Sequence, residues 1–328
     1  MERGIERVLD GFLAERRQDA TAIDPRLGSL VDELQATVGS GGKRLRPRLV
    51  LWGYRAGGCQ VDEPVLRAAA ALELLHTFAL IQDDVMDQSA TRRGRPASHV
   101  TLAAQASHDS ARFGESAAIL LGDLALIWAD RLMVESGFPP ARLEGGFAIY
   151  NALRTEVTLG QYLDVLLAHS ERPTEEDALR VDRYKTATYT VQRPIQLGLA
   201  LAGAAAEAIE AVPAYAVPAG IAFQLRDDLL GAVGDPARTG KPSGEDLLTH
   251  KPTWLWARTL RLAPEAAALT DLEALRRAVV DSGAAADAES KIAELVAEAL
   301  AAARRMPVPP TLREELVGMT EQMVVRTA

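Results

Sequence analysis

The sequence predicts an all-α protein, and two observations carry that prediction. Apolar residues recur three and four positions apart along nearly the whole chain, which is the repeat of one face of an α-helix. Alanine, the residue with the highest helix propensity, is abundant, and we find no convincing strand. With 48 % hydrophobic and 25 % charged residues among 328, the chain can bury a sizeable core.

Helices are expected in a regular succession, with ends placed to within about 2–4 residues. The segments are residues 5–18, 28–38, 46–55, 62–88, 115–135, 141–169, 175–206, 213–232, 252–262, 284–305 and 310–325. Turn-forming residues separate them, for example Gly39-Ser40-Gly41-Gly42 and Gly234-Asp235-Pro236. Thr174 is expected to cap the helix that begins at residue 175, since Glu175-Glu176-Asp177 suits the positive end of the helix dipole.

The chain is expected to form a single helical domain over residues 1–328, because it contains neither a linker-like segment nor a strong repeat. Two loops, 89–114 and 233–251, are longer than packing requires. Each follows an aspartate pair and carries basic residues, Arg92, Arg93 and Arg95 in the first and Arg238, Lys241 and Lys251 in the second. Long loops in compact domains are usually functional or disordered, and this matched position favours lids or phosphate clamps.

Composition excludes several classes of protein. A net charge of -9 argues against general nucleic-acid binding. The single cysteine, Cys59, allows no intramolecular disulfide and no thiolate metal cluster, which fits a reducing, cytoplasmic compartment. The N-terminus mixes charges without an apolar core and is not expected to be a signal peptide. The longest apolar region, 195–225, predicts a buried helix pair rather than a membrane span because charges and prolines interrupt it: Glu207, Glu210, Pro213 and Pro218.

Two aspartate pairs, Asp83-Asp84 and Asp227-Asp228, each lie at the polar end of a long apolar helical stretch. Residues four and seven apart share a helix face, so His76, Asp83 and Asp87 form one polar stripe, and Gln224 groups with the second pair. Converging carboxylates repel one another and lose hydration unless a cation neutralises them. Oxygen ligands without an obvious cage suit Mg²⁺, which keeps several waters and completes its shell with phosphate oxygens. The sequence therefore predicts a magnesium site.

Each of these motifs also has an ordinary explanation. One Asp-Asp-x-x-Asp string is weak evidence, because an exposed aspartate at a helix end needs no special reason. A second aspartate pair, Asp227-Asp228, is also followed by a basic loop, and this repetition makes coincidence a poor explanation. Lys43 and Arg46 could form a plain basic turn, but Gly41-Gly42 leaves backbone N–H groups accessible for an anion cradle. Arg92-Arg93 could simply pair with Asp87, and His76 could be a satisfied core histidine.

Taken together, the motifs resemble the trans-isoprenyl diphosphate synthases, the polyprenyl synthetase family, and most of all short-chain geranylgeranyl diphosphate synthases. The strings that carry the resemblance run in the family's order over roughly residues 40–255: Gly41-Gly42-Lys43-Arg44-Leu45-Arg46-Pro47, Asp83-Asp84-Val85-Met86-Asp87, Arg92-Arg93-Gly94, Lys185-Thr186, Phe223-Gln224 with Asp227-Asp228, Gly240-Lys241-Pro242 and Lys251. The resemblance implies the isoprenoid synthase helical bundle with a central apolar cavity. It also implies a homodimer without a membrane span, and head-to-tail condensation of isopentenyl diphosphate with an allylic diphosphate.

The resemblance also implies roles for individual residues and about three Mg²⁺ ions per active site with substrate bound. Asp83, Asp87 and Asp227 would be direct metal ligands, with Asp84 and Asp228 in or near the shell. The allylic diphosphate would be held by Arg92, Lys185, Thr186, Gln224, Lys241 and Lys251. Isopentenyl diphosphate would be held by Lys43, Arg46, His76 and Arg93. Basic groups would then flank one acidic cleft.

The chemistry expected of these residues needs no protein nucleophile. Metal cations and basic side chains stabilise the charge that develops on the leaving diphosphate, so that the allylic carbon–oxygen bond ionises. An apolar tunnel would keep water out. Ala79 is too small to stop a growing chain, whereas Phe78 occupies a position that stops it in many short-chain relatives. The resemblance therefore predicts geranylgeranyl diphosphate as the product, with farnesyl diphosphate as the alternative.

The chain departs from the family pattern at one position of the second motif. Gly231 stands three residues after Asp228, where the family usually has a third aspartate. We expect activity to survive this change, and Asp235 is near enough in the sequence to be considered a substitute.

Three other functions are compatible with parts of the sequence. A terpene cyclase shares the fold and the first motif, but it would carry an Asn-Asp/Ser-Glu metal triad that Gln224-x-x-Asp227-Asp228 does not supply. A non-catalytic partner subunit should have lost aspartates or basic residues, which this chain retains. In a magnesium-dependent phosphatase an Asp-x-Asp nucleophile follows a strand, whereas these aspartates end helices.

Overall fold

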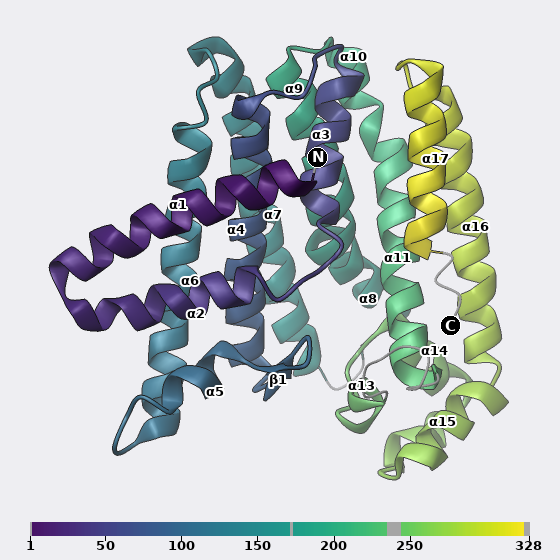
Figure 1. The fold of residues 1–328 in the computed structure, drawn as a ribbon. Coiled ribbons are helices and arrows are strands. Elements are labelled where there is room, and N and C mark those ends of the chain that lie inside the picture. Colours follow the sequence, from purple (N-terminus) through teal and green to yellow (C-terminus); the bar gives the residue numbers. More distant parts are fainter. Residues whose placement is uncertain (1, 171–172, 235–243, 325–328) are drawn as a thin grey trace. The chain divides into compact units, whose positions relative to one another are not determined.

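The structure is a computed structural model that describes residues 2–170, 173–234 and 244–324 (Figure 1). The regular elements of its described residues are all helices apart from one short hairpin, which confirms the predicted all-α class. The first helices are α1 (Glu2–Ile23), η1 (Pro25–Leu27), α2 (Gly28–Val38), α3 (Leu45–Ala56), α4 (Glu63–Met86), α5 (Ser98–Ala103), α6 (Ser110–Val134) and α7 (Pro140–Ala168). The hairpin joins β1 (Thr91–Arg92) to β2 (Arg95–Pro96).

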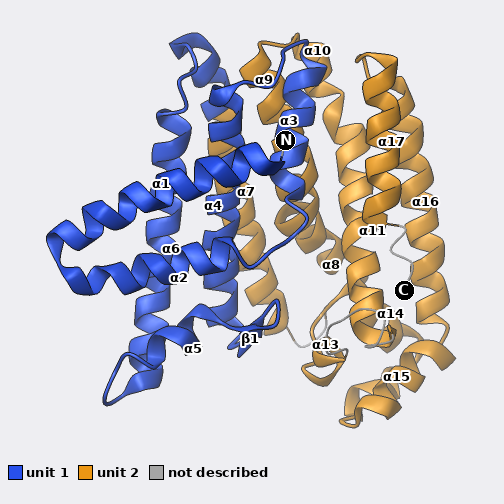
Figure 2. Cartoon of the chain, viewed as in Figure 1, with its two compact units in different colours: residues 1–147 blue, residues 148–328 orange. Residues whose placement is uncertain are grey.

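The later elements include one stretch of π-helix. They are α8 (Glu175–Val181), the π-helix η2 (Asp182–Gln192), α9 (Arg193–Ala202), α10 (Ala206–Glu210), α11 (Val212–Val233), α13 (Glu245–Leu248), α14 (Trp254–Leu262), η3 (Pro264–Ala268), α15 (Leu272–Asp281), α16 (Ala284–Arg305) and α17 (Pro310–Val324). The chain separates into two compact units, residues 1–147 and 148–328, with the boundary inside α7 (Figure 2). The expectation of one domain stays a prediction.

Unit 1 is built on α4, whose residues are buried along most of its length. Asp62 caps the helix by accepting a hydrogen bond from the backbone N–H of Val65 at 3.2 Å. The most extensive partner of α4 is α6, and the two helices approach closely at Gly122. A Cβ atom at Gly122 would lie 2.8 Å from Nε2 of Gln82, which donates to the carbonyl of Ile119 at 3.2 Å. Gln82 therefore ties the aspartate-bearing end of α4 to α6.

Unit 2 is built on α11, which packs against η2 and α16. The contact with η2 depends on Gly220, because a Cβ atom there would lie 2.4 Å from Cα of Ala187. Five residues before Gly220 on α11, the hydroxyl group of Tyr215 is hydrogen-bonded to that of Thr320 at 2.9 Å, and both residues are fully buried. Close backbone packing thus holds η2 on one side of α11.

Most predicted helices are confirmed, and Thr174 caps α8 in a capping box with Asp177 as expected. The predicted helix 175–206 is wrong in detail, since it divides into α8, η2 and α9 and ends at Ala202. Thr186, Thr188 and Thr190 lie in η2, and β-branched residues of this kind are stiff at χ1 and fit the α-helix less well. The two loops contain unpredicted elements, α5 and the hairpin in the first and α13 in the second, and α15 is a further helix that the pattern analysis missed.

Two helical stretches in the described ranges, Glu63–Met86 and Ala206–Val233, are long and apolar enough to cross a membrane. In each stretch more than half of the most apolar window is buried inside the protein, 61 % and 56 % respectively. Core helices have the same length and composition, so these stretches are weak evidence for a span.

We expect Gly220→Ala to lower the free energy of unfolding by about 1–3 kcal/mol, because the added methyl group would overlap the backbone at Ala187. The matched control is Gly11→Ala on the exposed face of α1, where a Cβ atom meets nothing within 4 Å. That change should raise the free energy of unfolding by about 0.5–1 kcal/mol. Urea denaturation measures both, and equal effects would contradict the close approach of α11 and η2.

Candidate active site

The first aspartate motif lies at the C-terminal end of α4. Asp83 and Asp84 belong to the last turn, and Asp87 is the C-cap residue, whose N–H donates to the carbonyl of Asp83 at 2.8 Å. Carboxylates at this end face the negative pole of the helix dipole, which disfavours their charge. The fold therefore concentrates negative charge where only a cation can offset it.

Arg92 supplies part of the offsetting charge. Its Nε donates to Oδ1 of Asp84 at 2.8 Å, and its Nη2 lies 3.4 Å from Oδ2 of Asp83. Asp84 is buried, and burial raises the pKa of its carboxyl group while the hydrogen bond from Arg92 opposes that shift. Arg92 is in turn placed by the hairpin, whose turn residues Arg93 and Gly94 have φ of 52° and 75°, the positive values of a type I′ turn.

A second basic group gathers around the glycine turn that precedes α3. Gly41 and Gly42 have φ of 87° and 130°, which favours glycine, and Arg93 donates a hydrogen bond to the carbonyl of Gly41. A Cβ atom at Gly42 would lie 3.0 Å from the guanidinium nitrogens of Arg93, so the guanidinium rests against the bare backbone. His76 belongs to the same cluster: burial lowers the pKa of its imidazole well below the usual range, and nearby guanidinium groups lower it further, namely those of Arg46, Arg93, Arg92 and Arg44. Unit 1 thus brings together Arg46, His76, Arg92 and Arg93.

Arg44 holds this basic turn in place through buried contacts. It is buried, with a left-handed φ of 46°, and its guanidinium pairs with the buried carboxylate of Glu73 on α4. Its remaining donors bond the carboxylate of Glu6 at 2.9 Å and the carbonyl of Val38 at 2.8 Å. Lys43, one residue before Arg44, is exposed, and Arg46 is partly exposed. The buried pair therefore fixes the backbone between two side chains that remain accessible.

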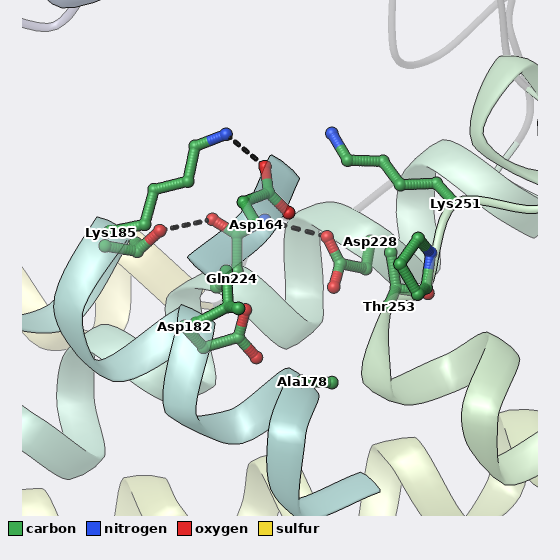
Figure 3. Close-up of a pocket in the computed structure, with 11 residues that line it drawn as sticks. Asp164, Ala178, Asp182, Lys185, Gln224, Asp228, Lys251 and Thr253 are labelled. Carbon is green, nitrogen blue, oxygen red and sulfur yellow. Dashed lines mark hydrogen bonds and ion pairs between the residues drawn. The ribbon is translucent and has the colours of Figure 1, made fainter. Parts of the chain in front are cut away.

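Unit 2 contains a pocket that holds most of the second predicted group. It is lined by Asp164, Ala178, Val181, Asp182, Lys185, Thr186, Gln224, Asp228, Lys251, Pro252 and Thr253. In Figure 3 the side chains of Lys185 and Lys251 extend to the same side of the pocket, above the carboxylates. The structure thus brings Lys185, Thr186, Gln224 and Lys251 together with Asp228, whereas the partly exposed Asp227 does not line the pocket.

Hydrogen bonds fix the orientation of these pocket side chains. The hydroxyl of Thr186 donates to Oε1 of Gln224 at 2.8 Å, and Nε2 of Gln224 donates to Oδ1 of Asp228 at 2.7 Å (Figure 3). Nζ of Lys185 lies 2.5 Å from Oδ2 of Asp164. Thr186 and Lys185 lie on η2, which approaches α7 very closely. A Cβ atom at Gly160 would lie only 2.6 Å from the backbone N of Lys185, so this approach requires glycine. Glycine on the neighbouring helix makes the arrangement possible.

The carboxyl groups of the pocket are strongly perturbed. Burial raises the pKa of Asp228 to about 7, the hydrogen bond from Gln224 opposes the shift, and the charges of Asp246 and Asp227 add to it. Burial also raises the pKa of Asp182 well above its usual range, with Asp228 and Asp164 contributing. Oδ2 of Asp182 is buried without a hydrogen-bond partner. A buried acidic cluster of this kind is stabilised by bound cations, because each positive charge offsets both burial and repulsion.

The turn before α14 presents Lys251 to the pocket. His250 has a left-handed φ of 51°, stacks on Trp256 with ring centroids 4.9 Å apart, and places its Nε2 3.0 Å from the carbonyl of Leu269. The next residue, Lys251, donates its backbone N–H to the carbonyl of Asp246 at 2.8 Å. Thr253 then caps α14 through the N–H of Trp256 at 3.2 Å. Lys251 is thus held from both sides.

Some predicted residues lie elsewhere, and some pocket residues were not predicted. Lys241 and the suggested substitute Asp235 lie outside the described residues. Phe78 and Ala79 are partly buried on α4, on the stretch that leads to Asp83. Sequence reasoning missed Asp164, Asp182 and Thr253. Asp182 lies three residues before Lys185, and that helical spacing could have identified it. Asp164 lies on a different helix from Lys185, so no spacing in the sequence relates the two.

The residues present fit a hard divalent cation that keeps part of its own water shell. Among the described residues, no three His, Cys, Asp or Glu side chains converge closely enough to hold a metal ion by themselves. Mg²⁺ is commonly bound through one or two carboxylates, with water and phosphate oxygens completing six-fold coordination. The all-oxygen donor sets at the ends of α4 and α11 match that mode, and the adjacent basic side chains match phosphate.

Comparison with known proteins gives a consistent result along the chain. The family model described as polyprenyl synthetase matches residues 29–291. A geranylfarnesyl diphosphate synthase of Aeropyrum pernix is 32 % identical over 300 residues, which cover 87 % of this chain and 90 % of that protein. A geranylgeranyl diphosphate synthase of Mycobacterium tuberculosis is 35 % identical over 265 residues, 79 % of this chain and 69 % of that one.

A solved structure gives the same result for the fold. It is a geranylgeranyl pyrophosphate synthase of Corynebacterium glutamicum in complex with isoprenyl diphosphate and magnesium. The similarity has a TM-score of 0.94 at 34 % identity and covers 98 % of each chain.

We expect Arg44→Met to lower the free energy of unfolding by about 3–5 kcal/mol, because it leaves the buried carboxylate of Glu73 without its partner. The control is Arg17→Met, which removes an exposed pair with Asp32 and should change stability far less. Guanidinium denaturation compares the two variants. An Arg44→Met protein no less stable than the control would show that the basic turn is not anchored by this pair.

Proposed function

The chain belongs to the polyprenyl synthetase family, and we propose that it condenses isopentenyl diphosphate head to tail with allylic diphosphates, with geranylgeranyl diphosphate as the main product. The observation that carries the proposal is that both aspartate pairs lie in the C-terminal part of long apolar helices, α4 and α11, beside fixed basic side chains. Arg92 is bonded to Asp84 in unit 1, and Lys185 lines the pocket that holds Asp228 in unit 2. Family members with geranylgeranyl products support the length of the product.

The proposed work of these residues is to stabilise a leaving diphosphate. Bound Mg²⁺ would supply positive charge to the oxygens of the leaving group. Asp83, Asp84, Asp87 and Asp227 would hold it, and Asp228 is next to Asp227 on α11. Arg92, Lys185, Thr186, Gln224, Lys241 and Lys251 would hold the allylic diphosphate. Positive groups that are already in place stabilise the charge that develops on the leaving diphosphate. The hydrogen bonds of Thr186 and Gln224 fix these side chains, so they need not reorient during the reaction.

Isopentenyl diphosphate is proposed to bind at the basic turn of unit 1, through Lys43, Arg46, His76 and Arg93. The lowered pKa of His76 keeps its imidazole neutral near pH 7, so it serves as a hydrogen-bonding group rather than a further charge. The guanidinium of Arg93 already rests against the bare backbone of Gly42, so a positive charge is fixed beside this turn. The terminal double bond of this substrate then attacks the allylic carbocation, and the released diphosphate takes up the proton that is lost.

A homodimer is supported by an apolar stripe on α6. Phe113, Leu120, Ile127 and Val134 recur every seven residues and are 44 %, 63 %, 60 % and 53 % exposed. Seven-residue spacing places them on one helix face, and exposed stripes of this kind usually pack against a second helix. We propose that the partner is a second copy of this chain, that residues 1–328 act as one domain, and that the protein works in the cytoplasm, which suits a sequence with a single cysteine and therefore no intramolecular disulfide.

The direct test incubates the protein and Mg²⁺ with labelled isopentenyl diphosphate and dimethylallyl, geranyl or farnesyl diphosphate in turn. Chromatography of the dephosphorylated products should show mainly a twenty-carbon alcohol. A fifteen-carbon product would make this a farnesyl diphosphate synthase instead, and no product from any starter would favour a non-catalytic partner subunit.

We expect Asp83→Asn to lower turnover by about 100-fold or more while the helical circular dichroism spectrum stays unchanged. The change removes charge from a proposed metal ligand that is partly exposed at the end of α4. Asp10→Asn, on the exposed face of α1, is the control and should retain full activity. Near-normal turnover of the Asp83 variant at saturating Mg²⁺ would remove the metal assignment.

Product length should respond to Phe78 and Ala79 in opposite directions. We expect Phe78→Ala to lengthen the main product beyond twenty carbons, because it removes the proposed floor of the apolar tunnel below Asp83. Ala79→Phe should shorten the product by placing a ring closer to the aspartates on the same helix. Product chromatography measures both, and an unchanged distribution in Phe78→Ala would locate the floor elsewhere.

A further inference from the structure

Glu33 is a buried carboxylate on α2 that the proposed reaction does not use. Its side chain is 6 % exposed. The hydroxyl of Ser98, the first residue of α5, donates to Oε1 of Glu33 at 2.9 Å, and the hydroxyl of Thr37 lies 3.1 Å from the same oxygen. Oε2 lies 3.3 Å from Nη2 of Arg95 on β2. Because a buried carboxylate loses its hydration, these three contacts offset the cost of burial, and they join α2 to β2 and α5.

Arg95, the partner of Glu33, stands opposite Arg92 in the hairpin. The two arginines are paired in the antiparallel register of β1 and β2. Residues paired in this way share one face of the ladder, and like charges there repel each other. Each guanidinium has a carboxylate of its own: Nε of Arg92 donates to Oδ1 of Asp84 on α4 at 2.8 Å, and Arg95 is paired with Glu33. The hairpin is therefore held by α4 through one strand and by α2 through the other.

The hairpin is short enough for its two strands to move together. Arg93 and Gly94 alone connect them, and the N–H of Ala97 donates to the carbonyl of Ala90 at 3.0 Å where the hairpin closes. A shift of β2 would therefore displace β1 and the turn, which carry Arg92 and Arg93. The position of these two guanidinium groups depends on what holds β2.

We infer that Glu33 is a positioning residue for the diphosphate site, because through Arg95 it fixes the hairpin that presents Arg92 and Arg93 to the substrates. This inference rests on the proposed function, in which Arg92 holds the allylic diphosphate and Arg93 holds isopentenyl diphosphate. Two alternatives give different experimental results. In one, Glu33 only fastens α5 through Ser98. In the other, Arg95, which is 35 % exposed, itself binds diphosphate.

The experiment measures by calorimetry the affinity of the full-length protein for inorganic diphosphate in the presence of Mg²⁺, together with the KM for each substrate. Glu33→Gln should raise both KM values and weaken diphosphate binding by about tenfold, the loss expected for one misplaced charge-assisted hydrogen bond. Arg95→Gln should have the same effect, and the double variant should bind no more weakly than either single variant, because both changes break the same link. Arg95→Lys keeps a positive donor for Glu33 and should stay within about threefold of the original affinity.

The matched control is Asp32→Asn, which removes a carboxylate from the neighbouring position of α2. Asp32 is 52 % exposed and pairs with Arg17, so its loss should leave diphosphate affinity and both KM values unchanged. Thermal melting shows that each variant is folded at the assay temperature. Glu33→Met, with an apolar side chain of similar length, replaces Glu33→Gln if that variant is not folded.

Three results would overturn the inference and leave the proposed function standing. Unchanged diphosphate affinity in Glu33→Gln would show that Glu33 serves only the packing of α5. Weaker binding in Arg95→Gln alone would assign the effect to a direct contact of Arg95 with diphosphate. Additive losses in the double variant would show that the two residues act separately. If the original protein binds no diphosphate in the presence of Mg²⁺, the diphosphate site itself fails, and both the inference and the proposed function fall.

Discussion

Negative charge at the ends of two apolar helices is the constraint on which the rest of the structure depends. At the end of α4, the helix dipole disfavours the charge of Asp83 and Asp84, and burial further disfavours that of Asp84. In the pocket beside α11, burial raises the pKa of Asp228 to about 7. On α11 the hydrogen bond from Gln224 offsets this shift only in part. The positive charge beside each group therefore comes from other segments of its unit.

The two units meet this requirement with different architecture. In unit 1 the positive charge comes from two connecting segments. One is the hairpin that carries Arg92, and the other is the glycine turn that the buried pair of Arg44 and Glu73 holds in place. In unit 2 it comes from the π-helix η2, which carries Lys185 and can approach its neighbours only where they have glycine, at Gly160 and Gly220. Close backbone contact and left-handed turns are costly, and both occur here beside the residues with chemical roles.

Much of this could be predicted from the sequence because it depends on local patterns. Helical periodicity locates most helices, and turn residues separate them, so α2 and α16 have the predicted ends. The aspartate pairs and the basic turn are visible because their members are close in the sequence. The family resemblance then orders them, and the comparisons confirm the family and the fold.

The parts that could not be predicted depend on contacts between distant segments. The π-helix packs closely against α7 at Gly160 and against α11 at Gly220, and no periodicity in the sequence encodes these contacts. Asp164 and Asp246 reach their positions through the packing of different helices. Asp235 was suggested as a substitute for the missing aspartate only because it is close in the sequence. The strands of the hairpin at Arg93-Gly94 are too short to show the alternation of polar and apolar residues that marks a strand. Glycine at the second turn position was the one local indication of a hairpin.

The central claim is that the carboxylate-bearing ends of α4 and α11 hold divalent cations. Anomalous X-ray scattering from crystals grown with Mn²⁺ and inorganic diphosphate tests it most directly. The account predicts peaks within about 2–2.5 Å of carboxylate oxygens of Asp83 or Asp87 and of Asp227, with diphosphate oxygens completing the coordination. Bound diphosphate without a manganese peak beside either helix end would contradict it.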